Sequence, residues 1–166
     1  MKEYRLAVDS TLIPLAKKMR TLGLDVAICQ AKTPAEALVF CRKEKRLLLT
    51  KNKQLARFFE KYNQEYLLVT TEKEGLKVVL ERFKKGKPRC PFCNKELVPI
   101  RREEAVGKVP VYVFLSSERF SRCPECGRVF WRGSHLRWIE EVIEHDFEGF
   151  EEDTGNRGDK GQHRHS

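Results

Sequence analysis

The chain has 166 residues, of which 34% are charged, and a formal net charge of +9. Neither an apolar run of about 18 residues, as needed to span a membrane, nor a signal-type amino terminus is present, so we expect a soluble cytoplasmic protein without a membrane partner. This length suits one domain of about 90 to 110 residues plus a small module that cannot bury an adequate core unaided.

The surplus of positive charge lies in the first part of the sequence. Residues 1–89 carry 21 Lys and Arg against 10 Asp and Glu, residues 90–146 carry 9 against 9, and residues 147–166 carry 3 against 5. A basic domain indicates a polyanionic partner, most simply nucleic acid. A Lys- and Glu-rich surface of the thermophilic kind is the alternative, although it would not by itself separate the signs.

Short apolar runs, each followed by a helical pattern, organise the first domain. The runs cover residues 4–8, 25–29, 46–50 and 66–70. Their length is typical of buried strands, and the segments after them place apolar residues at helical spacing. This alternation predicts an α/β fold with a parallel sheet flanked by helices.

The helical segments carry their own start and stop signals. Thr33-Pro34-Ala35-Glu36 and Thr71-Glu72-Lys73-Glu74 both match the capping box, in which Thr and Glu side chains bind backbone N–H groups at a helix start. Gly23 follows the first helical pattern and is expected to end it. Cys29 and Cys41 fall on apolar faces and are expected to be small buried hydrophobes.

A proline-containing segment, Gly86-Lys87-Pro88-Arg89, marks the domain boundary. We therefore predict a first domain over residues 1–86 and a small β-rich module with a C-terminal helix over residues 87–146. The module's strands are expected at residues 97–100, 109–115 and 128–131, and its helix at residues 134–145. The composition of residues 147–166 predicts disorder.

Two Cys-x-x-Cys knuckles hold four of the six cysteines, Cys90, Cys93, Cys123 and Cys126. Four thiolates arranged in two tight turns complete the tetrahedral coordination of Zn²⁺ and leave no position for water or substrate. The pattern therefore predicts a structural zinc ribbon. Disulfides are the competing interpretation, but two further cysteines and the cytosolic character of the first domain argue against them.

Polar residues follow the first three predicted strands. Asp9 ends the first strand, Glu36 opens the helix after the second, and Asn52 follows the third. Ligands of open parallel sheets bind outside the carboxyl ends of the strands, and hard oxygen donors there can hold Mg²⁺ or Mn²⁺. The alternative is that all three residues only cap helices.

Several short motifs occur in a specific order over residues 4–146. They are Leu6-Ala7-Val8-Asp9, Leu15-Ala16-Lys17, Leu22-Gly23, Leu47-Leu48-Leu49-Thr50-Lys51, the two knuckles and Phe130-Trp131-Arg132-Gly133-Ser134-His135. In this order they resemble the Mut-seven C-terminal RNase domain family. The resemblance implies a PIN-like nuclease domain fused to a zinc ribbon, action on RNA, and a divalent cation held by acidic residues at strand ends.

One position departs from the family pattern. Where the third-strand motif usually ends in Thr, a basic residue and Asp, this chain has Thr50-Lys51-Asn52. An amide oxygen can still bind a cation, but the site has one negative charge fewer, and Lys51 and Lys53 flank it. Asp9 and Glu36 are then the charged ligands that the resemblance transfers, and cation affinity is expected to fall.

Two functions therefore remain open. The first is a metal-dependent ribonuclease with Asp9, Glu36 and Asn52 in its catalytic centre; the second is a catalytically impaired RNA-binding or ribonucleoprotein adaptor. A protein-interaction module is a third alternative, and His135 can instead orient the last helix. The candidate RNA contacts are basic residues of the first domain and of the ribbon motif: Lys17, Arg20, Lys51, Lys53, Arg132 and His135.

Overall fold

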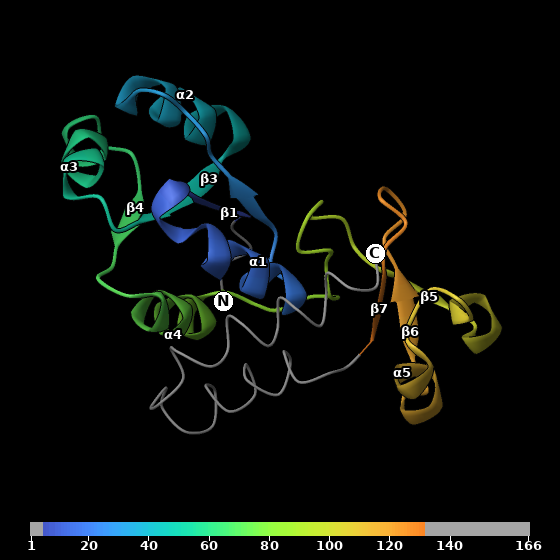
Figure 1. Cartoon of the computed structure of the whole chain (residues 1–166). Coiled ribbons are helices and arrows are strands. Elements are labelled where there is room, and N and C mark those ends of the chain that lie inside the picture. The colour runs from blue at the N-terminus through green and yellow to red at the C-terminus, as the bar shows by residue number, and fades with distance from the viewer. Residues whose placement is uncertain (1–4, 132–166) are drawn as a thin grey trace. The chain divides into compact units, whose positions relative to one another are not determined.

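The computed structural model describes residues 5–131. It divides into two compact units, Met1–Asn94 and Lys95–Ser166 (Figure 1). The first knuckle, Cys90 to Cys93, belongs to the first of these units. The predicted C-terminal helix, the tail, Arg132 and His135 lie outside the described residues.

A parallel sheet forms the centre of the first unit. Its strands are β1 (Arg5–Val8), β2 (Val26–Ile28), β3 (Arg46–Thr50) and β4 (Tyr66–Leu68), in the order β2-β1-β3-β4. β3 is buried along its whole length, which explains its uninterrupted apolar run. The predicted parallel sheet is confirmed.

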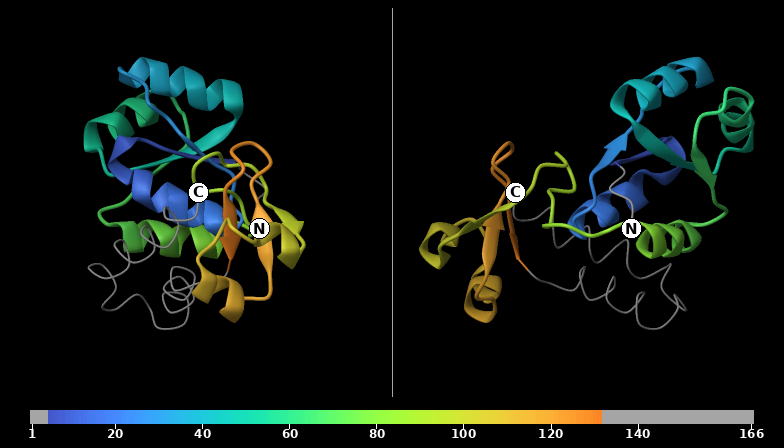
Figure 2. Two further views of the ribbon diagram at one scale, coloured as in Figure 1. Left: turned by 45° about the vertical axis from the view of Figure 1, so that its right-hand side comes forward. Right: turned by 180° about the vertical axis from the view of Figure 1, so that it is seen from behind.

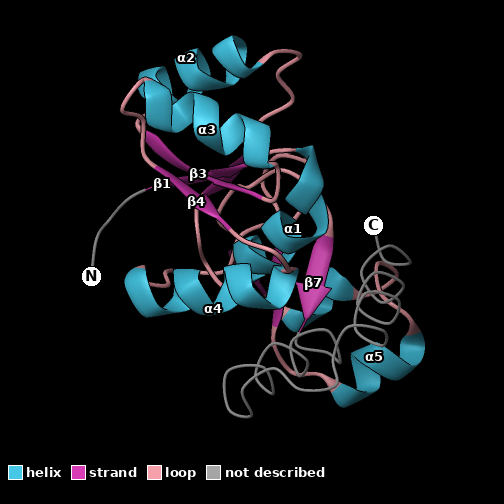
Figure 3. Ribbon diagram, turned by 90° about the vertical axis from the view of Figure 1, so that its left-hand side faces the viewer, coloured by secondary structure: helices cyan, strands magenta, loops and turns pink. Residues whose placement is uncertain are grey.

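Helices cover both faces of this sheet. They are the 3₁₀ turn η1 (Ser10–Leu12) and the helices α1 (Ile13–Thr21), α2 (Pro34–Glu44), α3 (Lys53–Lys61) and α4 (Glu72–Arg82). Figure 3 shows α2 and α3 on one face of the sheet and α1 and α4 on the other, and the views in Figure 2 agree. The predicted Thr caps are present, because Thr33 and Thr71 accept hydrogen bonds from the backbone N–H groups of Glu36 and Glu74.

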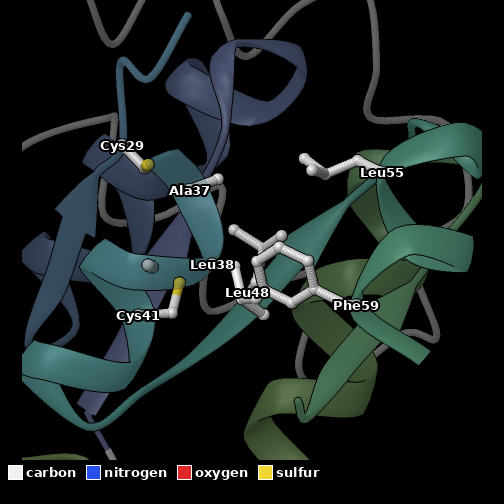
Figure 4. Packing of buried hydrophobic residues seen from close by; sticks show 8 residues of the cluster. Cys29, Ala37, Leu38, Cys41, Leu48, Leu55 and Phe59 are labelled. Carbon is white, nitrogen blue, oxygen red and sulfur yellow. The ribbon is translucent and has the colours of Figure 1, made fainter. Parts of the chain in front are cut away.

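Two apolar layers result from the alternation of side chains along the strands. On the α2–α3 side, Figure 4 shows Phe59 beside Leu38 and Leu48. On the other side, Gly75 allows α4 to approach α1, since a Cβ there would lie 2.9 Å from a methyl carbon of Leu15. Both layers are closely packed.

The buried thiol of Cys41 predicts a loss of stability in alkali. Burial raises the pKa of Cys41 from 9.0 to about 12. Between these values the unfolded chain releases a proton that the folded chain keeps, so the free energy of unfolding falls as pH rises. We expect a wild-type slope steeper than that of Cys41→Ala by up to about 1.4 kcal/mol per pH unit, measured by urea unfolding from pH 8 to 11. Parallel slopes for the two proteins would contradict this prediction.

The second unit contains a small antiparallel sheet of order β5-β6-β7. Its strands are β5 (Val98–Ile100), β6 (Phe120–Arg122) and β7 (Val129–Trp131), and η2 (Arg102–Ala105) and α5 (Val111–Ser116) lie between β5 and β6. Its core is small, with Ala105, Val113, Phe120 and Val129 buried. Figure 2 shows β6 and β7 as neighbouring strands.

The prediction of a strand at residues 109–115 is wrong, because this segment contains helix α5. Val113 is buried and Phe114 half-buried, whereas Val111, Tyr112 and Leu115 are exposed, so the exposure does not alternate as in a half-buried strand. Sequence patterning missed β6, since Phe120-Ser121-Arg122 contains a single apolar residue. No helix within residues 5–131 is long and apolar enough to cross a membrane.

Candidate functional site at the carboxyl edge of the sheet

Asp9 lies at the carboxyl end of β1 and is 9% exposed. Its Oδ2 accepts a hydrogen bond of 2.6 Å from the Thr50 hydroxyl at the end of β3. Its Oδ1 accepts bonds from the backbone N–H and the hydroxyl of Thr11. Asp9 therefore joins two neighbouring strand ends and also caps η1.

Glu36 and Asn52 are both exposed and both cap helices. Glu36 Oε1 accepts a 3.0 Å bond from the backbone N–H of Lys32, which precedes the capping Thr33. Asn52 Oδ1 accepts bonds of 2.9 and 3.2 Å from the N–H groups of Gln54 and Leu55. Both residues therefore cap helices in the structure. A carboxylate has about four lone-pair sites, so the capping bond leaves Glu36 able to bind another group.

The buried thiol of Cys29 feels the charges of both carboxylates. The backbone N–H of Cys29 donates a 2.7 Å bond to the carbonyl of Val8, which places Cys29 beside the end of β1. Burial raises the pKa of the Cys29 thiol, and the negative charges of Asp9 and Glu36 raise it further. That Asp9 and Glu36 form one site at this edge of the sheet stays a prediction from the order of the strands.

The cysteines of the two knuckles form a second site. The Sγ atoms of Cys90, Cys93, Cys123 and Cys126 all lie within 4.8 Å of one another. A tetrahedral Zn²⁺ with bonds of about 2.3 Å requires four thiolates at this kind of separation, so the residues present fit the metal. Within residues 5–131 this is the one cluster of at least three His, Cys, Asp or Glu groups positioned for a metal ion.

Most of the chain matches the model of one known protein family. The model of the Mut7-C RNAse domain matches residues 4–143. The chain belongs to the Mut7-C RNase domain family. Neither the curated proteins nor the solved structures contain a significant match. The parallel sheet and the cysteine cluster are thus features of a Mut7-C chain.

The basic residues proposed to contact RNA occupy different environments in this Mut7-C domain. Lys51 and Lys53 are exposed and flank Asn52 at the carboxyl edge. Lys17 is half-buried, with its Nζ 5.3 Å from the centre of the Phe92 ring. Arg20 is buried, with its guanidinium bound to the main-chain carbonyls of Val26 and Pro91, an environment that favours a structural role.

Sequence reasoning missed the threonines that hold Asp9. Thr50 also accepts a 2.9 Å bond from the N–H of Asn52, and Thr11 accepts one of 3.1 Å from the N–H of Lys51. These bonds tie Asp9 and the segment after β3 into one network. Thr50 lies within the range that the family model matches, but no local pattern reveals that its partner is Asp9.

Proposed function

We propose that this Mut7-C protein binds RNA and hydrolyses its phosphodiester bonds with Mg²⁺ or Mn²⁺ held by Asp9 and Glu36. The observation that carries the proposal is the buried Asp9 carboxylate at the carboxyl edge, which accepts a 2.6 Å bond from Thr50 at the end of the neighbouring strand. Carboxylate oxygens are the hard donors that these cations favour. Family membership points in the same direction, towards RNA.

The chain's own residues supply orientation and charge. Thr11 and Thr50 fix the Asp9 carboxylate through hydrogen bonds to both of its oxygens. Lys51 and Lys53 offer exposed positive charge directly after β3, where they can hold the phosphates of RNA. A bound divalent cation would supply Lewis acidity and lower the pKa of a coordinated water.

Asp9→Asn is expected to reduce RNA cleavage by at least about 100-fold, because it removes a charge that the cation needs. The assay uses the zinc-loaded full chain with labelled single-stranded RNA in buffers of defined Mg²⁺ or Mn²⁺ concentration. Glu81→Gln is the matched control, since it removes one carboxylate from an exposed position of α4. Equal cleavage by wild type and Asp9→Asn would refute the nuclease proposal.

A specific observation favours the adaptor as a second candidate. Asn52 is neutral, and its carbonyl oxygen already accepts two bonds from the start of α3. The carboxyl edge of the sheet therefore attracts a dication less strongly than a site with a third carboxylate would. In this alternative the protein binds RNA within a ribonucleoprotein without cutting it.

Asn52→Asp separates the two candidates. An Asp still caps the helix and adds a negative charge, so an impaired centre should gain Mg²⁺-dependent cleavage of at least about tenfold over wild type. The affinity of the adaptor for RNA should not depend on Mg²⁺. It should fall about 10³-fold between 50 and 200 mM salt if at least six phosphates are contacted. Cleavage by wild type that Asn52→Asp leaves unchanged would contradict the adaptor.

A further inference from the structure

The first cysteine knuckle is built into the first unit by main-chain and side-chain bonds. The N–H of Arg89, just before Cys90, donates a 2.8 Å bond to the carbonyl of Arg20 at the end of α1. Asn94, just after Cys93, accepts a 3.2 Å bond from the N–H of Val26 in β2 and donates a 2.8 Å bond to Asp25. Both sides of the knuckle are therefore anchored to α1 and β2.

Arg20 reaches into the knuckle from α1. Its side chain is buried, its Nε donates a 2.8 Å bond to the carbonyl of Val26, and its Nη1 donates a 2.6 Å bond to the carbonyl of Pro91. Pro91 lies between the two cysteines of the knuckle. One guanidinium thus connects the edge strand β2 to the turn that presents two metal ligands.

The buried charge of Arg20 needs a negative partner, since an unpaired buried cation is costly. The charge of Asp25 acts on Arg20, but the Asp25 carboxylate accepts its hydrogen bonds from Arg46 and Asn94. Burial lowers the pKa of Arg20, and the charges of Cys90, Asp25 and Cys93 oppose that shift. A centre of one Zn²⁺ and four thiolates carries a net charge of −2, which an adjacent guanidinium can balance.

We propose that Arg20 is a positioning residue of the cysteine centre, which balances the charge of the metal-bound thiolates and holds the Pro91 turn in place. Metal binding and the packing of β2 then stabilise each other, because both use the same side chain. This role is independent of the proposed nuclease activity. It also explains why a basic residue occupies the buried face of α1.

The test measures zinc affinity of the full chain by competition with a chromophoric chelator. Arg20→Gln is expected to weaken zinc binding about 10- to 100-fold, the usual effect of losing a partner outside the ligand shell. Arg20→Lys, which keeps the charge but not the fork of donors, should lose less than Arg20→Gln but more than twofold. Leu55→Ala, which removes a buried side chain of α3 on the opposite face of the sheet, should leave zinc affinity unchanged.

The effect of zinc on β2 provides a second readout, because coupling between metal binding and the packing of β2 acts in both directions. Removal of zinc from wild type should increase hydrogen exchange at the N–H of Val26, which bonds to Asn94, and exchange there should depend less on zinc in Arg20→Gln. Zinc affinity within twofold of wild type in Arg20→Gln would overturn the proposal, even if the variant is less stable. Should Arg20→Gln not fold, the same criterion applies to Arg20→Lys.

Discussion

Cys123→Ser is expected to abolish high-affinity zinc binding and to unfold the second unit. Cys123 is buried and belongs to the four-thiol cluster, and serine is a far weaker zinc ligand than a thiolate. The core of this unit is too small to compensate, since its hydrophobic cluster contains four buried residues, one of which is an alanine. Structural zinc contributes about 10 to 16 kcal/mol of apparent binding free energy in small zinc domains.

Two measurements test this prediction: the zinc content of the purified chain and the amide hydrogen exchange of β6 and β7. Cys29→Ser is the control, because Cys29 is buried but lies outside the cluster. It should retain one zinc per chain, whereas Cys123→Ser should retain none and lose protection in both strands. Normal protection of β6 and β7 in metal-free Cys123→Ser would show that the unit folds without the metal.

Gly23→Ala is expected to destabilise the first unit by about 4 kcal/mol, for two reasons that add. Gly23 has φ +94°, a conformation that disfavours any residue with a Cβ. An added Cβ would also lie 2.2 Å from the carbonyl oxygen of Gly86, which is backbone and cannot rotate away. The N–H of Gly86 donates a 2.9 Å bond to the Gly23 carbonyl, so the two segments cannot separate without breaking it.

Two matched variants separate the causes in urea unfolding of the zinc-loaded chain. Gly107→Ala has a similar φ of +79° but open space around the new Cβ, so it should cost only about 1 kcal/mol. Gly86→Ala meets the Gly23 carbonyl at 3.2 Å without a positive φ, and its cost should lie below that of Gly23→Ala. Similar losses for Gly23→Ala and Gly107→Ala would show that the close approach to Gly86 contributes little.

The sheet of the first unit could be predicted because its signals are local. Each strand is a short apolar run, and the Thr caps at Thr33 and Thr71 form within one turn of helix. The segment at residues 109–115 was wrongly predicted to be a strand because a short apolar run fits strand and helix equally well. Its helical form is decided by which side chains reach the small core, Val113 among them.

The sequence by itself determined the strand–helix alternation, the four zinc ligands and the polar residues after the strands, because these depend on spacing along the chain. Only the tertiary structure decided which of these residues meet. It paired Asp9 with Thr50 across two strand ends, turned Arg20 inward onto Pro91, and included the first knuckle in the first unit. Such contacts join residues far apart in the chain, and their partners follow from packing rather than from local pattern.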